Sequence, residues 1–173
     1  MTTSWIDKID EIGESPLTRA SRSGRTEVAN LMLMQQANDA PLGFGQLPDI
    51  HRAAAWGFED VLGDLIDDGA DVDEMDGQGE TPLHKAVRLG NAEAARALIE
   101  HGANINAADS LGMTPLHWAA LTGNADITDL LLANFANVEA HDYAIGGITP
   151  LGIAKLLGYS EVKDRMIHRC TYR

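Results

Sequence analysis

The apolar positions of this sequence recur in blocks of 33 residues. The segment GETPLHKAVRLGNAEAARALIEHGANINAAD begins at Gly79, and GMTPLHWAALTGNADITDLLLANFANVEAHD begins at Gly112. In each block a short apolar pattern opens at Thr-Pro and stops at a glycine, and a second apolar pattern follows. Thr-Pro is a helix-start signal and glycine is a helix-stop signal. Each block therefore predicts two short helices joined by a tight turn.

The same block is found in five windows of the chain. Steps of 33 residues back from Gly79 give windows at Gln46 and Gly13, and a window at Gly147 follows after two inserted residues. A glycine ends the first apolar pattern in every window (Gly24, Gly57, Gly90, Gly123 and Gly158). Five aligned windows predict a repeat protein, in which each unit packs only against its neighbours.

These residues resemble the ankyrin repeat family, whose units read Thr-Pro-Leu-His-x-Ala-Ala, then Gly, then a Leu-Leu pair, then Gly-Ala-x-x-Asn/Asp-Ala. The resemblance covers residues 13–173. It implies an all-α solenoid of stacked helix–turn–helix units with β-hairpin loops. We expect a single domain over residues 1–173 with a capping helix at 4–12, where Trp5 and Ile9 share an apolar face. The repeats are expected at about 13–45, 46–78, 79–111, 112–146 and 147–173, the last with a C-terminal cap.

Four features depart from the regular pattern. Gln36 and Phe135 replace the glycine that ends the second helix. A residue other than glycine costs about 1–2 kcal/mol in left-handed geometry, so one or both helix ends are expected to differ. The segment 38–47 lacks the Asp-x-x-Gly hairpin pattern, and the insertion in Tyr143–Gly147 lengthens the fourth loop. Irregular geometry is expected at both loops.

The charge of the chain narrows the choice of partner. The net charge is −13 and the isoelectric point is about 4.6, which argues against nucleic acid and anionic membranes because both would be repelled. A protein with a basic surface is the electrostatic complement. Ten acidic residues and no Lys or Arg lie between Glu59 and Glu80. This run fits either a solvated outer face or a surface that steers a basic partner.

The sequence also indicates a compartment. Cys170 is the single cysteine, so no intramolecular disulfide forms, which fits a reducing environment. The first residues lack the apolar core of a signal peptide, and no apolar run reaches the length of a membrane span. A cytoplasmic location is the simplest expectation.

Candidate catalytic and metal-binding chemistry is weak. His51, His84 and His117 lie one period apart, which suggests either a metal site or general base, or a structural histidine in each repeat. Neighbouring helices pack about 8–10 Å apart, whereas zinc ligands lie about 2.0–2.1 Å from the ion, so a periodic ladder favours the structural role. A calcium loop starting at Asp71 fails because its fifth position is Met75. The sequence shows no phosphate loop, dinucleotide fingerprint or nucleophile elbow. We therefore predict a protein that is not an enzyme and that has no catalytic residue, cofactor or metal.

The resemblance places a partner on the hairpin tips and on the exposed side of each first helix, which together form a concave surface. The candidate partner-binding residues, carried over by position, are Phe44, Leu47, Trp56, Gln78, Glu80, Arg88, Leu89, Ser110, Leu111, Met113, Trp118, Leu121, Thr122, Tyr143 and Ile145. Six of them are apolar at positions expected to face solvent: Leu47, Trp56, Leu89, Leu111, Met113 and Leu121. They form either an apolar binding stripe or residues that pack between repeats.

The predicted function is protein binding, as an adaptor, scaffold or inhibitor. A free monomer is expected, and the alternative is a module that self-associates through the same apolar stripe. Asn106 occupies the hairpin position that resembles the asparagine hydroxylated in many animal ankyrin repeats. That likeness implies a modification only where the source has such an enzyme.

Overall fold

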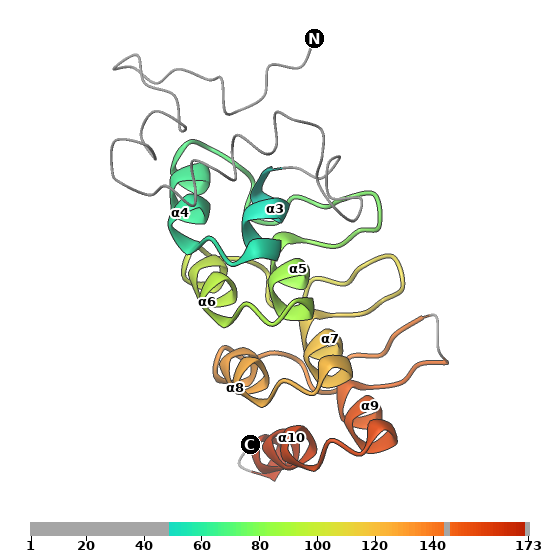
Figure 1. The fold of residues 1–173 in the computed structure, drawn as a ribbon. Coiled ribbons are helices and arrows are strands. Elements are labelled where there is room, and N and C mark those ends of the chain that lie inside the picture. The colour runs from blue at the N-terminus through green and yellow to red at the C-terminus, as the bar shows by residue number, and fades with distance from the viewer. Residues whose placement is uncertain (1–48, 144–145, 172–173) are drawn as a thin grey trace, which may run out of the picture. The chain divides into compact units, whose positions relative to one another are not determined.

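The computed structural model describes residues 49–143 and 146–171, with side chains up to His168. The predicted capping helix at 4–12, the first repeat with Gln36, and the segment 38–47 lie outside the described residues. Figure 1 shows the described helices as pairs stacked in two parallel rows. The described residues form helices and loops without a strand, and the predicted all-α solenoid is confirmed.

The two rows follow the two apolar patterns of each repeat. The first pattern forms the inner helices, which are α3 (Asp49–Trp56), α5 (Pro82–Arg88), α7 (Pro115–Thr122) and α9 (Pro150–Leu157). The second forms the outer helices, which are α4 (Glu59–Asp67), α6 (Ala92–Glu100), α8 (Ala125–Ala133) and α10 (Ser160–Thr171). α5 packs on α7 and α7 on α9, while α4, α6, α8 and α10 pack in the same order. From α5 and α6 onward, each unit therefore contacts the next in both rows, and α4 joins the first described unit to the second.

The Thr-Pro signals mark the helix starts as predicted. Thr81, Thr114 and Thr149 are the N-cap residues of α5, α7 and α9, and each precedes a proline in the first turn. In α9 the Thr149 Oγ1 accepts the N–H of Gly152 at 3.1 Å. A hydroxyl at this position satisfies an N–H that has no partner within the helix.

Loops between repeats run out from the inner helices as paired hairpins (Figure 1). The N–H of Asp76 donates to the carbonyl of Glu80 at 3.0 Å, and the N–H of Asp109 donates to that of Met113 at 2.9 Å. Adjacent loops are joined by the N–H of Ser110, which donates to the carbonyl of Gln78 at 3.0 Å. Neighbouring hairpins therefore hold one another in register along the stack.

The lengthened fourth loop keeps the same closure. The N–H of Asp142 donates to the carbonyl of Ile148 at 3.2 Å, and the N–H of Tyr143 donates to that of Leu111 at 2.8 Å. The insertion therefore extends the tip of this hairpin and leaves its base paired, while residues 144–145 lie outside the described ranges.

The core consists of aliphatic side chains between the two rows. Leu83, Leu98, Leu116, Ile127 and Leu131 are fully buried, and many of the other buried side chains are alanines, as expected for a chain with 5% aromatic residues. Burying each of the larger side chains stabilises the fold by about 1.5–3 kcal/mol. Since most contacts between helices join different units, the repeats are stable only as a stack.

The end of α8 keeps the geometry of a glycine-ended helix. Phe135 takes the left-handed conformation itself, with φ 66°, and its N–H donates to the carbonyl of Leu132 at 3.1 Å. Gly102 ends α6 in the same way, with φ 87° and a bond to Ile99 at 3.0 Å. Of the two ends expected to depart from the pattern, the one at Phe135 is therefore kept despite the strain, and the one at Gln36 lies outside the described residues.

We predict that Phe135→Gly raises the free energy of unfolding by about 1 kcal/mol, because glycine adopts this conformation without strain. The matched control is Gly102→Ala, which should lower the same quantity by about 1 kcal/mol. A Cβ on Gly102 would meet no other atom within 4 Å, so that loss reports the backbone alone. Urea unfolding followed by circular dichroism measures both. A less stable Phe135→Gly variant would show that contacts of the ring outweigh the strain.

Candidate partner-binding surface

The periodic histidines tie each inner helix to the loop of the following repeat. Nε2 of His84 lies 3.0 Å from the carbonyl oxygen of Met113, and Nε2 of His117 lies 3.1 Å from that of Ile148. Nδ1 of His84 accepts the N–H of Thr81 at 3.0 Å, so the proton of the neutral ring is on Nε2. The structural role predicted for these histidines is confirmed.

The first histidine of the ladder makes only half of this pattern. Nε2 of His51 lies 2.9 Å from the carbonyl oxygen of Glu80, while its Nδ1 is buried without a hydrogen-bond partner. The sequence has Pro48 at the position of Thr81, and proline carries no N–H to donate. Burial lowers the pKa of His51, His84 and His117, and the carbonyl bonds offset this only in part. Within the described residues, no three His, Cys, Asp or Glu side chains are grouped as metal ligands.

A buried network of charges supports the hairpin that precedes α5. Nζ of Lys85 lies 2.6 Å from Oδ2 of Asp76 and also pairs with Glu80, and the side chains of all three are almost fully buried. Oδ1 of Asp76 accepts the N–H groups of Gln78 and Glu80, at 2.8 and 2.9 Å. Burial alone would raise the pKa of Asp76, but the hydrogen bonds from Lys85 and from these two N–H groups outweigh it and lower the pKa.

In the next hairpin, the equivalent carboxylate of Asp109 is held by hydrogen bonds without a paired cation. Oδ1 of Asp109 accepts the N–H groups of Leu111 and Met113 at 2.9 Å, and Oδ2 accepts Nε1–H of Trp118 at 3.1 Å. Trp118 lies one period after Lys85, and Met113 lies one period after Glu80. One repeat therefore uses an ion network where the next uses an indole and an apolar side chain.

Two of the predicted surface residues are corrected by these contacts. Met113 is 2% exposed and Glu80 is 2% exposed, so neither faces a partner, and the expectation that Met113 faces solvent was wrong. Both occupy the equivalent position just before Thr-Pro. Their carbonyls meet the histidine of the preceding repeat, and their side chains are buried.

Exposed aliphatic side chains mark the ends of the inner helices. Leu89, Leu121, Leu156 and Leu157 are 46%, 39%, 78% and 45% exposed, and we call these four residues the leucine stripe. Each is one of the two residues that precede the turn glycine of its repeat. Leu156 was missed from the sequence, although it is detectable there because it lies 35 residues after Leu121, one period plus the two inserted residues.

The remaining predicted residues divide by exposure. Besides Leu89 and Leu121, the exposed ones are Gln78, Ser110, Leu111, Thr122 and Tyr143, which lie on hairpin tips or at the end of α7. Trp56, Arg88 and Trp118 are half-buried. Phe44, Leu47 and Ile145 lie outside the described residues. The guanidinium of Arg88 lies 5.4 Å above the ring of Trp118 and 3.4 Å from Oε2 of Glu80, so its position beside Leu89 is fixed on two sides.

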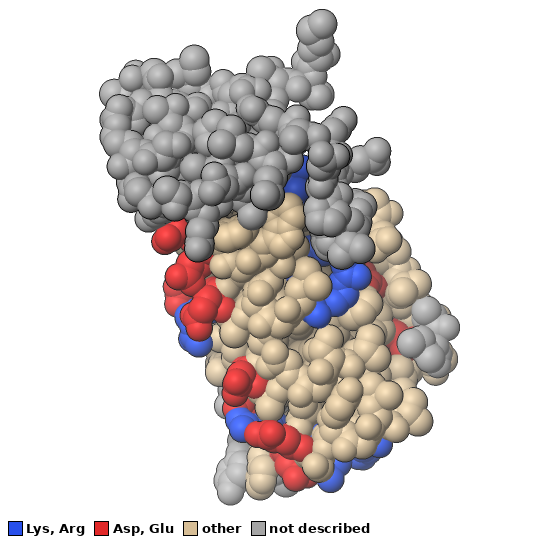
Figure 2. Space-filling model, in the orientation of Figure 1, with Lys and Arg blue, Asp and Glu red and all other residues tan. Residues whose placement is uncertain are grey.

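Charge separates the two rows of helices. In Figure 2 the acidic side chains gather over the outer helices, and the surface over the inner helices is mostly uncharged. The exposed acids of the outer helices include Glu59, Asp60, Glu93, Asp126 and Glu161. Among the inner-helix side chains that the structure describes, the charged ones are all basic, namely Arg52, Lys85, Arg88 and Lys155. Lys85 is buried and paired with two carboxylates, so the described basic side chains that reach the surface of the inner row are Arg52, Arg88 and Lys155.

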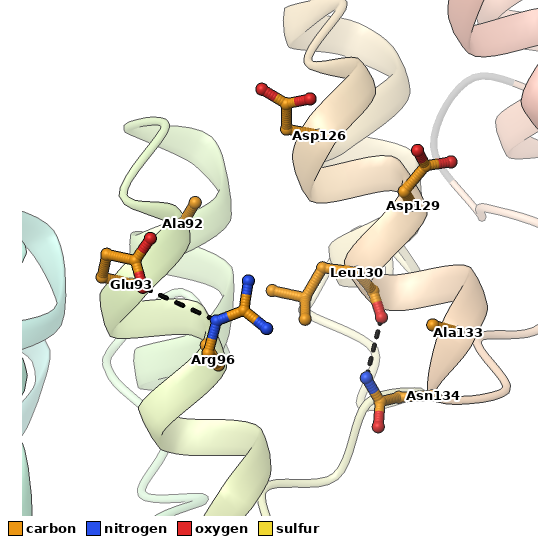
Figure 3. Close-up of a pocket in the computed structure, with 8 residues that line it drawn as sticks. All are labelled: Ala92, Glu93, Arg96, Asp126, Asp129, Leu130, Ala133 and Asn134. Carbon is orange, nitrogen blue, oxygen red and sulfur yellow. Dashed lines mark hydrogen bonds and ion pairs between the residues drawn. The ribbon is translucent and has the colours of Figure 1, made fainter.

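A shallow groove of about 560 Å³ lies between the outer helices α6 and α8. Figure 3 shows the guanidinium of Arg96 directed across it toward Leu130, with Asp129 turned away. Nε of Arg96 lies 3.5 Å from a carboxylate oxygen of Glu93, and Asp129 pairs with Arg165. Glu93 and Arg96 thus pair with each other within the groove, and Asp129 pairs with Arg165 outside its lining.

Comparison with known families agrees with this architecture. The model for ankyrin repeats (3 copies) matches residues 50–142, which is more than half of the chain. The chain belongs to the ankyrin repeat family. Ankyrin repeats are generally modules for protein–protein interaction, and the family is typically non-enzymatic. A search of curated proteins found no match to this ankyrin repeat protein. Within the described residues, no helix has the length and apolar character needed to cross a membrane.

Proposed function

We propose that this ankyrin repeat protein binds a protein partner through the leucine stripe and the neighbouring hairpin tips, as an adaptor, scaffold or inhibitor. The observation that supports the proposal is the exposure of four leucines, each one of the two residues before the turn glycine that follows α5, α7 or α9. Exposed apolar patches of this kind usually mark interaction surfaces. Leu111 and Tyr143, which are 50% and 80% exposed at the hairpin tips, add apolar contact area.

The acidic run from Glu59 to Glu80 is assigned to a solvated face in this proposal and not to the binding surface. Its members Glu59, Asp60 and Asp67 lie on the outer helix α4 and are exposed. An outer position suits a solvated face that keeps the molecule soluble. The chemistry of the partner is then set by the stripe and by Arg88 rather than by the net charge. We infer a cytoplasmic site of action, since a single cysteine suits a reducing compartment.

Leu121→Asp combined with Leu156→Asp should weaken partner capture at least about tenfold, because each new carboxylate loses water in the interface without gaining a partner. Capture from native lysate, quantified by mass spectrometry against the wild-type protein, measures the loss. The matched control is Phe135→Asp, which makes the same kind of change at a residue 72% exposed on the outer side of the stack, after α8. Equal capture by the double variant and the wild type would refute the stripe as the binding surface.

The alternative is self-association through the same leucines. It predicts that light scattering shows a mass that grows with concentration and that Leu121→Asp abolishes the growth. End-to-end stacking is disfavoured by charge. Ala120 and Thr128 are fully buried, whereas Lys155 and Lys163 hold the equivalent positions in the last repeat. A further unit packed on that face would have to bury both lysines.

A further inference from the structure

The spacing of the leucine stripe restricts the shape of what covers it, provided that the stripe is the binding surface proposed above. The inner helices α5, α7 and α9 pack in sequence, and packed helices lie about 8–10 Å apart. A helix rises 1.5 Å per residue, so every seventh residue recurs on nearly the same face after about 10.5 Å. A partner helix lying along the stack therefore presents one side chain to each repeat.

Other chain conformations fit less well. Three residues of a β-strand also span about 10 Å, but side chains three apart point to opposite faces. A polyproline II segment returns to the same face after about 9.3 Å, which matches the spacing. Such segments dock in grooves lined by aromatic rings, whereas the exposed residues of this stripe are Leu89, Leu121, Leu156 and Leu157. An aliphatic stripe favours the helix.

One charge within the stripe adds a second restriction. Arg88 is the single charged residue among the eight that precede Gly57, Gly90, Gly123 and Gly158 in pairs. Its guanidinium is held over Trp118 and near Glu80, and its side chain keeps 31% of its surface exposed. A guanidinium fixed in this way matches the planar geometry of a carboxylate. The carboxylate of Glu80 already lies 3.4 Å from one side of the guanidinium, so a carboxylate of the partner meets its exposed remainder.

We propose that the stripe binds an amphipathic helix of a partner protein, with aliphatic residues seven positions apart and an acidic residue opposite Arg88. The aliphatic residues contact Leu89, then Leu121, then Leu156 and Leu157. The acidic residue lies within one turn of the aliphatic residue that meets Leu89. The acids of the outer helices lie in the other row of the stack and do not define this partner.

The test uses a displayed library of 21-residue helical peptides with randomised surface positions, selected on the full chain. The expected winners carry aliphatic residues at three positions seven apart, with Asp or Glu enriched near one end of the series. The decisive variant is Arg88→Leu combined with Leu121→Arg. This double exchange keeps composition and net charge and moves the cation by one repeat. The peptide position at which Asp or Glu is enriched should then shift by seven residues. In read counts, peptides with the acidic residue at the new position should exceed those with it at the old position at least tenfold.

The possible outcomes separate this proposal from the proposed function. If the selected peptides lose binding to the Leu121→Asp, Leu156→Asp variant but lack the seven-residue period, the proposed binding surface is supported and the proposed helical partner is refuted. Enrichment of proline with a three-residue period would identify a polyproline II ligand and overturn the helix. An acidic preference that fails to move, or a library without winners, also overturns it. Winners that bind the double Asp variant as well as the wild type would refute the surface itself.

Discussion

Replacing Lys85 by methionine is expected to lower the free energy of unfolding by about 3–5 kcal/mol, because it leaves buried carboxylates without their cation. Asp76 and Glu80 both pair with Nζ of Lys85, and the side chains of all three are at most 4% exposed. Arg88 lies 3.4 Å from Glu80 but is not paired with Asp76, so it compensates only part of the loss. Urea unfolding followed by circular dichroism measures the effect.

The following repeat supplies a matched control for this substitution. Glu80→Met combined with Lys85→Trp copies Met113 and Trp118, which occupy the equivalent positions beside Asp109. Replacing a buried ion pair by well-packed apolar groups is often neutral or stabilising, so the double variant should recover most of the stability lost in Lys85→Met. If the double variant is as unstable as the single one, the two repeats do not use interchangeable solutions.

Acid is expected to destabilise the stack in the range just below pH 6.5. The pKa values of His51, His84 and His117 are lowered in the folded protein, chiefly by burial. The unfolded chain therefore binds more protons than the folded one once the pH falls below about 6.5. The free energy of unfolding has its full value above that pH. It declines as the pH falls, until each histidine is protonated in the folded protein as well. The slope of the free energy of unfolding against pH approaches about 4 kcal/mol per pH unit where all three histidines are protonated in the unfolded chain but not in the folded one. Each such proton contributes about 1.4 kcal/mol per pH unit.

The slope is tested by urea midpoints measured from about one pH unit above to about one and a half units below the ordinary histidine pKa of about 6.5. His84→Gln removes one of the three titrating groups and should reduce the slope by about 1.4 kcal/mol per pH unit. All other titratable groups are the same in the two proteins, so the comparison isolates His84. An unchanged slope in His84→Gln would show that the ladder does not control acid stability.

Local signals explain why so much of the fold was predictable from the sequence. Thr-Pro and the turn glycines act within a few residues of themselves, and their period places every helix of the stack. The role of the histidines followed from the same period, because side chains one repeat apart cannot converge on one ion. Leu121 and Leu89 were found from the same signal, since each lies within two residues of the glycine that ends its inner helix, Gly123 or Gly90.

The errors come from contacts that only the folded chain creates. Lysine and glutamate are seldom fully buried unless they are paired. No local sequence pattern predicts that Lys85 pairs with Asp76 and Glu80 at the base of a hairpin. Met113 was misplaced because it is the apolar counterpart of Glu80, a relation that is visible only once the burial of both is known. At Phe135 the stack keeps a strained helix end that local preference disfavours, so local signals alone could not decide which helix end would depart from the pattern.

Hydrogen exchange of the protein in complex with its captured partner tests the central claim most directly. The binding account predicts slowed exchange at the ends of the inner helices α5, α7 and α9 and at the tips around Leu111 and Tyr143, with α6 and α8 unchanged. Slowed exchange confined to the outer helices, beside the acidic residues and the groove of Figure 3, would contradict it.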